Sequence, residues 1–229
     1  MRQTYASRTA FVLHSLDDRL APDGRVLLDV GFIGTYAEAS VHYAVVDAMR
    51  ASDRLIGIDV DAERLAGFLA AEETKARRAK HALRYETMSI LETRFADAEI
   101  DVVLLLEVFE HLFTPYCVFD EIARILKPGG VLVMTYPNPL NLSLLLRFLL
   151  RDNLLDAQFR RMFRGAPDHR IFPHPVCLAN YLDDRGFEVG RLAFIKYAYK
   201  RLGVLNKLLM RLVVTRKLSS YVGVYAVKR

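Results

Sequence analysis

Short apolar runs alternate with segments of helical spacing along most of the chain. The strongest run, residues 100–106 (IDVVLLL), contains a single charged residue, as expected of a strand buried on both faces of a parallel sheet. Six weaker runs also predict strands: residues 25–30, 54–58, 82–88, 131–136, 187–195 and 221–227. This alternation predicts β-α-β units with right-handed crossovers, and therefore a mostly parallel sheet of seven strands with helices on both faces.

Helical spacing of apolar residues fills most of the intervals between these runs. It predicts helices at residues 4–20, 37–50, 121–126, 175–185 and 199–218. The sequence Lys-Pro-Gly-Gly at residues 127–130 ends the third of these helices. After residues 137–139 (PNP) a Leu- and Arg-rich stretch of helical character, residues 140–165, interrupts the alternation.

Two strand ends carry residues that suit a nucleotide-like ligand. Ligands of open α/β sheets bind outside the carboxyl ends of the strands, where the strand order reverses. Gly31 follows the first predicted strand, and its missing side chain permits a sharp turn and the close approach of a ligand. Asp59 and Asp61 follow the second strand; one can bind the two hydroxyls of a ribose, as in NAD or S-adenosylmethionine, while the other caps the next helix. We expect Asp59 to bind the ribose and Asp61 to be the cap.

A longer pattern surrounds the strongest strand. Residues 101–112 (DVVLLLEVFEHL), 120–130 (DEIARILKPGG) and 136–138 (YPN) resemble, in that order, a run typical of class I methyltransferases. With the two strand-end motifs, this resemblance covers residues 25–138, about half of the chain. Residues 168–188 are more loosely similar to small-molecule methyltransferases of quinone and surface-sugar pathways. An NAD-dependent reductase would leave the PGG sequence at residues 128–130 unexplained.

The resemblance implies a Rossmann-like class I methyltransferase fold that binds S-adenosylmethionine. It implies a single domain, residues 1–229, in three parts. These are a cofactor-binding core (residues 24–139), a helical lid insertion (residues 140–170) and a C-terminal, substrate-side part with a basic helix (residues 171–229).

The same resemblance implies which residues contact the cofactor. Gly31 and Gly34 would admit its methionine end, with Asp29 orienting the turn, and Asp59, with Val60 beside it, would bind the ribose. The remaining expected contacts are Met88, Ser89 and Ile90 around the adenine, and Glu107, through its backbone carbonyl, at the methionine amino group.

The chain departs from the usual family pattern at two places. Ile33 and Thr35 stand where the family's first loop has its second and third glycines, and Ser89 stands in place of an acid near the adenine. We interpret the first as a variant loop. The rival hypothesis is a methyltransferase-like interaction or regulatory domain that does not catalyse a reaction.

Methyl transfer to a hydroxyl is helped by a base, and histidine titrates in the useful range. Three histidines are candidates: we prefer His169, with His111 and His174 as alternatives, although His111 can equally serve in packing behind the cofactor. The other three, His14, His42 and His81, are expected to be structural or exposed. Cys117 and Cys177 lack metal-ligand spacing, and no metal site is predicted.

The formal net charge of +5 is unevenly distributed. After Glu188 the chain has ten Lys or Arg residues and no acid, so the basic character is local. Together with the leucines and arginines of residues 140–165, it suggests a greasy, anionic acceptor rather than a nucleic acid. With the family resemblance, this leads us to expect methyl transfer, at oxygen, to a small-molecule, lipid-linked or sugar-linked acceptor. Residues 196–217 would form either a solvated helix or a contact with an anionic membrane surface. The absence of a signal peptide or a long apolar run leads us to expect a cytoplasmic protein, either free or peripheral to a membrane.

Overall fold

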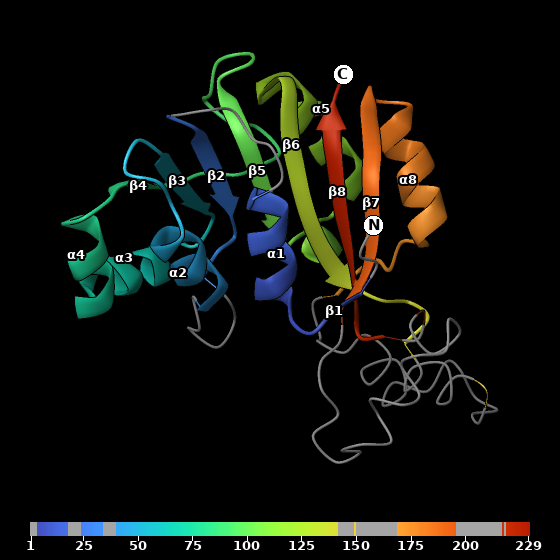
Figure 1. Ribbon diagram of the computed structural model, residues 1–229, viewed down its shortest axis with the longest axis horizontal. Helices are drawn as coiled ribbons and strands as arrows, with labels where there is room; N and C mark the ends of the chain where they lie inside the picture. Colours follow the sequence, from blue (N-terminus) through green and yellow to red (C-terminus); the bar gives the residue numbers. More distant parts are fainter. Residues whose placement is uncertain are drawn as a thin grey trace.

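The computed structural model describes residues 4–17, 24–33, 40–141, 149, 169–195, 217 and 219–229. Within these residues, eight strands form one sheet in the order β1-β7-β8-β6-β5-β2-β3-β4 (Figure 1). The strands are β1 (Thr4–Tyr5), β2 (Val26–Val30), β3 (Arg54–Asp59), β4 (Ala82–Thr87), β5 (Ile100–Leu106), β6 (Leu126–Pro137), β7 (Phe187–Ile195) and β8 (Tyr221–Lys228). All neighbours are parallel except β8, which runs antiparallel to both β6 and β7.

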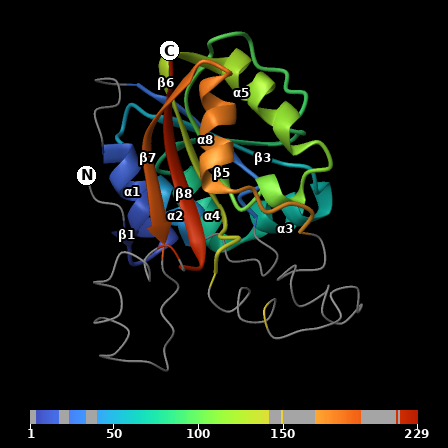
Figure 2. The same cartoon turned by 90° about the vertical axis from the view of Figure 1, so that its right-hand side faces the viewer.

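Helices cover both faces of the sheet (Figure 2). The described helical elements are α1 (Arg8–Asp17), α2 (Ser40–Asp47), α3 (Ala62–Ala70), α4 (Glu72–Arg78), η1 (Phe109–His111), η2 (Pro115–Cys117), α5 (Val118–Ile125) and α8 (Pro175–Asp183). Helices α1 and α2 pack on one face, whereas α5 and α8 pack on the other.

The central strand β5 shows why the apolar runs are continuous. Its side chains alternate between the two faces: Val103 and Leu105 belong to the core under α5 and α8, whereas Val102 and Leu104 belong to the core under α1 and α2. All four side chains are fully buried. A strand between two helical layers therefore needs apolar residues at successive positions, which explains the sequence of residues 100–106.

The predicted fold class is confirmed, with one strand more than the seven expected. Residues 4–20 were expected to form one helix, but Thr4 and Tyr5 instead add a short parallel strand beside β7. Tyr5 is 2% exposed, and its ring lies 5.2 Å from that of Phe11 in an edge-on contact, so burial of this aromatic ring favours the extended edge over another helical turn.

The strand order reverses between β5 and β2, because the chain runs outward through β2, β3 and β4 and then returns to start β5. The carboxyl ends of β2, β3, β5 and β6 all lie at the lower edge in Figure 1. Sheets of this kind bind their ligands at such a reversal.

Several expectations fall outside the described residues. These include Gly34, nearly all of the lid (residues 140–170) and nearly all of the basic segment (residues 196–217). In the part of the chain that is described, no helix is both long and apolar enough to span a bilayer.

Candidate functional site

The turn after β2 is closely packed and has no room for a side chain at Gly31. Gly31 has a φ of +59°, and its backbone N–H donates a 2.8 Å hydrogen bond to the carbonyl of Ile58 at the end of β3. A Cβ atom at this position would lie 2.6 Å from Cγ2 of Val108. The glycine turn therefore packs against the segment that follows β5. Both segments lie where the strand order reverses, which is where sheets of this kind bind ligands.

Asp29 is held at the end of β2 by a buried chain of hydrogen bonds. Its Oδ2 lies 2.8 Å from Nδ1 of His42, and Nε2 of the same ring lies 2.9 Å from the hydroxyl of Tyr85. Burial raises the pKa of Tyr85, so its hydroxyl keeps its proton and can donate it to the histidine. His42 is 2% exposed, which agrees with the structural role expected for it.

Asp61, as expected, caps the helix that follows β3. Its side chain accepts a 3.0 Å hydrogen bond from the backbone N–H of Arg64 at the start of α3. Asp59, 8% exposed, accepts from the backbone N–H of Asp61 through Oδ1, at 3.0 Å. The structure thus assigns the cap to Asp61, while the ribose-binding role of Asp59 stays a prediction.

The residues expected around the adenine follow β4. Met88 and Ile90 are 8% and 3% exposed and belong to the core under α5 and α8, whereas Ser89 between them is partly exposed. The Ser89 hydroxyl accepts a 3.2 Å hydrogen bond from the backbone N–H of Leu91. The backbone N–H of Met88 donates to the carbonyl of Asp59 at 3.0 Å, which ties this segment to the end of β3.

Glu107 directly follows β5 in a strained and poorly solvated position. Its φ is +59°, an uncommon conformation for a residue with a side chain. Burial raises the pKa of its carboxyl to about 7, against the opposing effect of the Arg8 guanidinium. Arg8 Nη1 lies 3.8 Å from Glu107 Oε2. Helix α1 thus brings a cation to the carboxyl end of β5.

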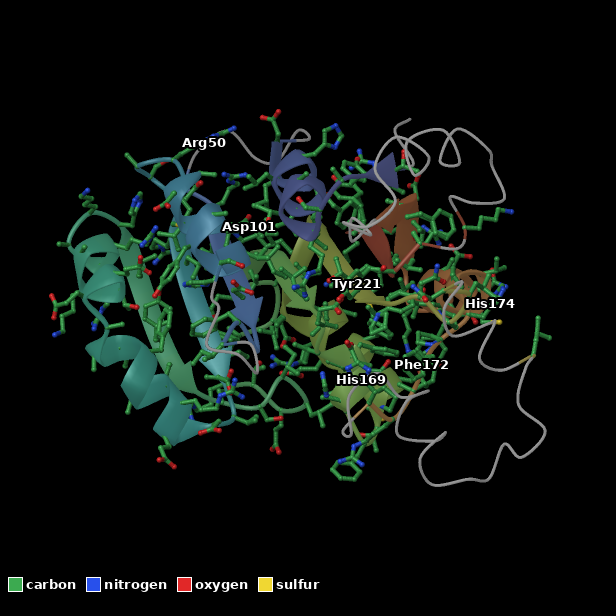
Figure 3. All side chains as sticks on the ribbon, turned by 90° about the horizontal axis from the view of Figure 1, so that it is seen from below. Arg50, Asp101, His169, Phe172, His174 and Tyr221 are labelled. Atoms are coloured by element: carbon green, nitrogen blue, oxygen red, sulfur yellow. The ribbon has the colours of Figure 1, made fainter. Side chains whose placement is uncertain are left out.

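Three ionisable side chains meet directly after this strand end. Glu110 and His111 lie in η1, and His169 comes from the segment before α8. His169 Nε2 is 3.9 Å from Glu110 Oε1, and the two histidine rings meet edge-on with centroids 4.8 Å apart. Figure 3 looks onto this edge of the molecule and shows His169 beside Phe172, whose ring centroid lies 5.7 Å from that of His169.

His174, the third candidate histidine, lies apart from this group (Figure 3). It is exposed and precedes α8, where its Nδ1 accepts a 3.3 Å hydrogen bond from the backbone N–H of Val176. The structure therefore brings two of the three candidate histidines together. Val60 also points outward, with 72% of its surface exposed.

Sequence reasoning missed Glu110, Arg8 and Tyr85. Glu110 had the clearest signal, because its carboxyl group stands next to His111 in the run that resembles the methyltransferases. Arg8 and Tyr85 are far in sequence from the residues they contact, Glu107 and His42, so no local pattern could have found them.

Comparison with known proteins decides the family of the central segment. A family model described as a methyltransferase domain matches residues 29–134, from the buried carboxylate of β2 into β6. Residues 29–134 are a methyltransferase domain. For this methyltransferase domain, the class I fold and S-adenosylmethionine as cofactor, both expected from the sequence, are confirmed. The tight turn of positive φ at Gly31, bonded to the end of β3 at the strand reversal, fits the place where such a cofactor binds.

Individual relatives agree with this family. The chain is 32% identical over 120 residues to an uncharacterized methyltransferase of Mycobacterium leprae, covering 50% of this chain and 38% of that protein. It is 30% identical over 166 residues to a ubiquinone biosynthesis O-methyltransferase of Psychrobacter arcticus, covering 72% of this chain and 59% of the relative. The match therefore spans less than two thirds of either relative.

The structural comparison extends over nearly the whole chain. An S-adenosylmethionine-dependent methyltransferase from Aquifex aeolicus superposes with a TM-score of 0.61 at 17% identity. The superposition covers 97% of this chain and 90% of that one. At this identity the likeness shows the shared fold.

Proposed function

We propose that the protein transfers a methyl group from S-adenosylmethionine to a hydroxyl oxygen of a small-molecule, lipid-linked or sugar-linked acceptor. The observation that carries this proposal is the pairing of His111 and His169 immediately after β5. His111 donates its backbone N–H to the carbonyl of Val108, the residue that packs against the glycine turn. His111, and with it His169, is therefore linked through Val108 to the glycine turn where the cofactor is expected.

The chemistry asks little of the protein beyond alignment and proton removal. The sulfonium of S-adenosylmethionine supplies an activated methyl group, so the chain must place the acceptor in line with it and exclude water. A hydroxyl acceptor must also lose its proton, and an imidazole can help remove it. The side chain of His169 is 14% exposed, so an acceptor can reach it. We assign this help to His169, with His111 beside it.

The cofactor contacts belong to the same proposal. Asp59 would bind the ribose hydroxyls, and Gly31 would let the methionine end approach the backbone, together with Gly34. Asp29, whose Oδ1 is buried without a hydrogen bond to any described residue, would orient this turn. The other proposed contacts are Val60 at the ribose, Met88, Ser89 and Ile90 at the adenine, and the Glu107 carbonyl at the methionine amino group.

The rim beside the histidines suits an acceptor with an apolar body and a negative charge. Phe113 is 80% exposed, and the guanidinium of Arg170 lies 3.6 Å from the centre of its ring. Arg170 Nε also donates a 3.2 Å hydrogen bond to the carbonyl of His111. An exposed aromatic ring and a fixed cation beside the histidine pair favour a lipid- or sugar-linked acceptor. The relative from Psychrobacter arcticus, named as an O-methyltransferase, supports oxygen as the acceptor atom.

The test combines cofactor binding with turnover. The purified protein should bind S-adenosylhomocysteine in a calorimeter and transfer a labelled methyl group to members of a panel of phenols, catechols and lipid-linked sugars. His169→Ala should lower turnover about 10²- to 10⁴-fold while the affinity for S-adenosylhomocysteine holds. His81→Ala, in the turn before β4, is the matched control.

Two outcomes would contradict the proposal. Unchanged turnover in His169→Ala would remove this residue from proton transfer and direct the same test to His111 and His174, or show that no base is needed. A folded protein that binds neither S-adenosylmethionine nor S-adenosylhomocysteine would instead be an interaction domain without catalysis.

A further inference from the structure

We infer that Glu110, His111 and His169 bind a divalent metal ion, and that this ion holds the hydroxyl of the acceptor. Binding of the ion stands on the geometry of the three side chains. Its role in methyl transfer rests on the proposed function. The sequence predicted no metal site, because neither cysteine has ligand spacing around it. His169 lies far along the chain from Glu110 and His111, so no local spacing indicates this cluster.

The three side chains already approach the arrangement of a metal site. Each offers one ligand atom, and these atoms all lie within 4.8 Å of one another. Bonds of about 2.0–2.2 Å to one ion place neighbouring ligand atoms roughly 3–3.5 Å apart. The Glu110–His169 distance of 3.9 Å is close to this spacing and longer than a hydrogen bond. Small side-chain rotations would bring all three onto one ion.

Backbone contacts hold the two chain segments of this cluster together. The backbone N–H of Arg170 donates a 2.7 Å hydrogen bond to the carbonyl of Glu110, and the Arg170 side chain donates to the carbonyl of His111. These two hydrogen bonds fix Arg170 to η1, and they thereby keep the adjacent residue, His169, close to Glu110 and His111. Ligands held by main-chain bonds need little reorganisation when an ion binds.

The burial of the Glu110 carboxyl group favours the binding of a cation beside it. The Glu110 side chain is completely buried, and a buried carboxylate is costly unless an opposite charge or a metal ion compensates it. A protonated His169 at 3.9 Å is one source of that charge, and a divalent ion is a stronger one. An ion pair between Glu110 and His169 needs no metal, whereas a metal site binds a divalent ion. A metal-binding experiment therefore separates the two alternatives.

The donor set indicates which ions fit. Two imidazole nitrogens and one carboxylate oxygen suit first-row divalent ions such as Mn²⁺ and Zn²⁺, whereas Ca²⁺ prefers oxygen ligands alone. Three protein ligands leave at least one coordination position open. That position is where a hydroxyl oxygen would bind.

At such an ion the acceptor hydroxyl becomes more acidic. The coordinated oxygen releases its proton to a water molecule, and its electron pair then forms the bond to the methyl carbon. The bond between that carbon and sulfur breaks, and its electron pair stays on sulfur as S-adenosylhomocysteine. When the ion is bound, it takes over the proton-removing role that the proposed function gives to the His169 imidazole, and His169 contributes by holding the ion.

The test measures Mn²⁺ directly. Tag-free protein, treated with a chelator and dialysed, is titrated with MnCl₂ while the electron paramagnetic resonance signal of free Mn²⁺ is recorded. The wild type should bind one Mn²⁺ per chain, and Zn²⁺ should displace it. His169→Ala should weaken Mn²⁺ binding at least about 10-fold, since one of three protein ligands is lost, whereas His81→Ala should bind like the wild type. His111→Ala provides a second variant if His169→Ala fails to fold.

The outcomes separate this inference from the proposed function. No Mn²⁺ binding by the wild type, or equal binding by folded His169→Ala and His111→Ala, would overturn the metal site and leave Glu110 and His169 as an ion pair. Methyl transfer that persists at full rate in excess chelator would overturn the role of the ion in catalysis. Mn²⁺ binding at the three residues without transfer to any hydroxyl acceptor would uphold the site and contradict the proposed function.

Discussion

The two halves of the candidate site, on either side of the strand reversal, are built differently. At the ends of β2, β3 and β4, polar side chains are engaged in short hydrogen bonds, such as those from Asp29 through His42 to Tyr85. At the end of β5, ionisable groups are crowded and buried at longer distances, as with Glu110 and His169 at 3.9 Å. The first half is held by hydrogen bonds between described side chains, whereas the second half brings ionisable side chains together around a buried carboxyl group.

This difference assigns different tasks to the two halves. Fixed donors and acceptors suit a cofactor that is the same in every turnover, because they need no reorganisation when it binds. Buried ionisable groups suit the step in which a proton leaves the acceptor. Substitutions at the ends of β2–β4 should therefore change cofactor affinity, and substitutions after β5 should change the response to pH or metal ions.

Glu107→Gln, at the end of β5, should produce the largest change in stability, and this change should depend on pH. The folded-state pKa of about 7 lies above the ordinary value of 4.5, so the folded protein binds more protons between these pH values than the unfolded chain. The stability contributed by this group is present at low pH and is lost as pH rises toward 7. Urea unfolding should show Glu107→Gln more stable than the wild type by at most about 3 kcal/mol at pH 8.5, and by less at pH 5.5.

A control separates this effect from the loss of one negative charge. Glu72→Gln removes a carboxylate that is 88% exposed at the start of α4. If Glu107→Gln shows the same stability difference from wild type at both pH values, burial does not govern the ionisation of Glu107.

Asp59→Ala should have an intermediate effect, confined to cofactor binding. Loss of the carboxylate should weaken binding of S-adenosylhomocysteine by about 2 kcal/mol, roughly 30-fold, because charge-assisted hydrogen bonds to the ribose disappear. Asp61→Ala is the control: it should lose about 1 kcal/mol of stability with the helix cap while the affinity holds. Calorimetry that finds a folded Asp59→Ala as tight as the wild type would show that the ribose is bound elsewhere.

Tyr85→Phe should have the smallest effect. The hydroxyl lost from the hydrogen-bond chain should cost about 1 kcal/mol of stability, measured by thermal unfolding. Tyr43→Phe removes a comparable hydroxyl, bonded to Thr74 at 2.9 Å and separate from Asp29. We expect similar destabilisation in both variants but a fall of cofactor affinity, by a factor of about two to five, in Tyr85→Phe alone. Equal affinities would show that Asp29 needs no support from this chain.

The fold could be predicted from the sequence in most respects because parallel strands buried on both faces leave continuous apolar runs. Strands β5 and β7 have the predicted bounds, and the other predicted strands differ by one to five residues at an end. The edge strand β1 was missed, since two residues are too few to show a period and their partners in β7 are 190 residues further along the chain. Strand β6 also starts at Leu126 rather than after the Lys-Pro-Gly-Gly turn.

The site was predictable only where its parts are local in sequence. Asp61 as a cap and Gly31 as a tight turn follow from neighbouring residues. The meeting of His169 with Glu110 depends on how the segment before α8 returns to η1, and the contact of Arg8 with Glu107 depends on where α1 lies. Neither is encoded in a spacing, so both required the three-dimensional structure.

The two positions 31 and 33 of the turn after β2 differ in which side chains they can accept. Gly31 faces two independent constraints, a positive φ and the Val108 side chain, and a mutation elsewhere can relieve only the second. Two residues later, Ile33 is 6% exposed and packs with Phe32, Leu65 and Phe68. A glycine could be exchanged there because an apolar side chain gained a place in the core. The apolar residue at position 33, where the family pattern has a glycine, is therefore explained by local packing.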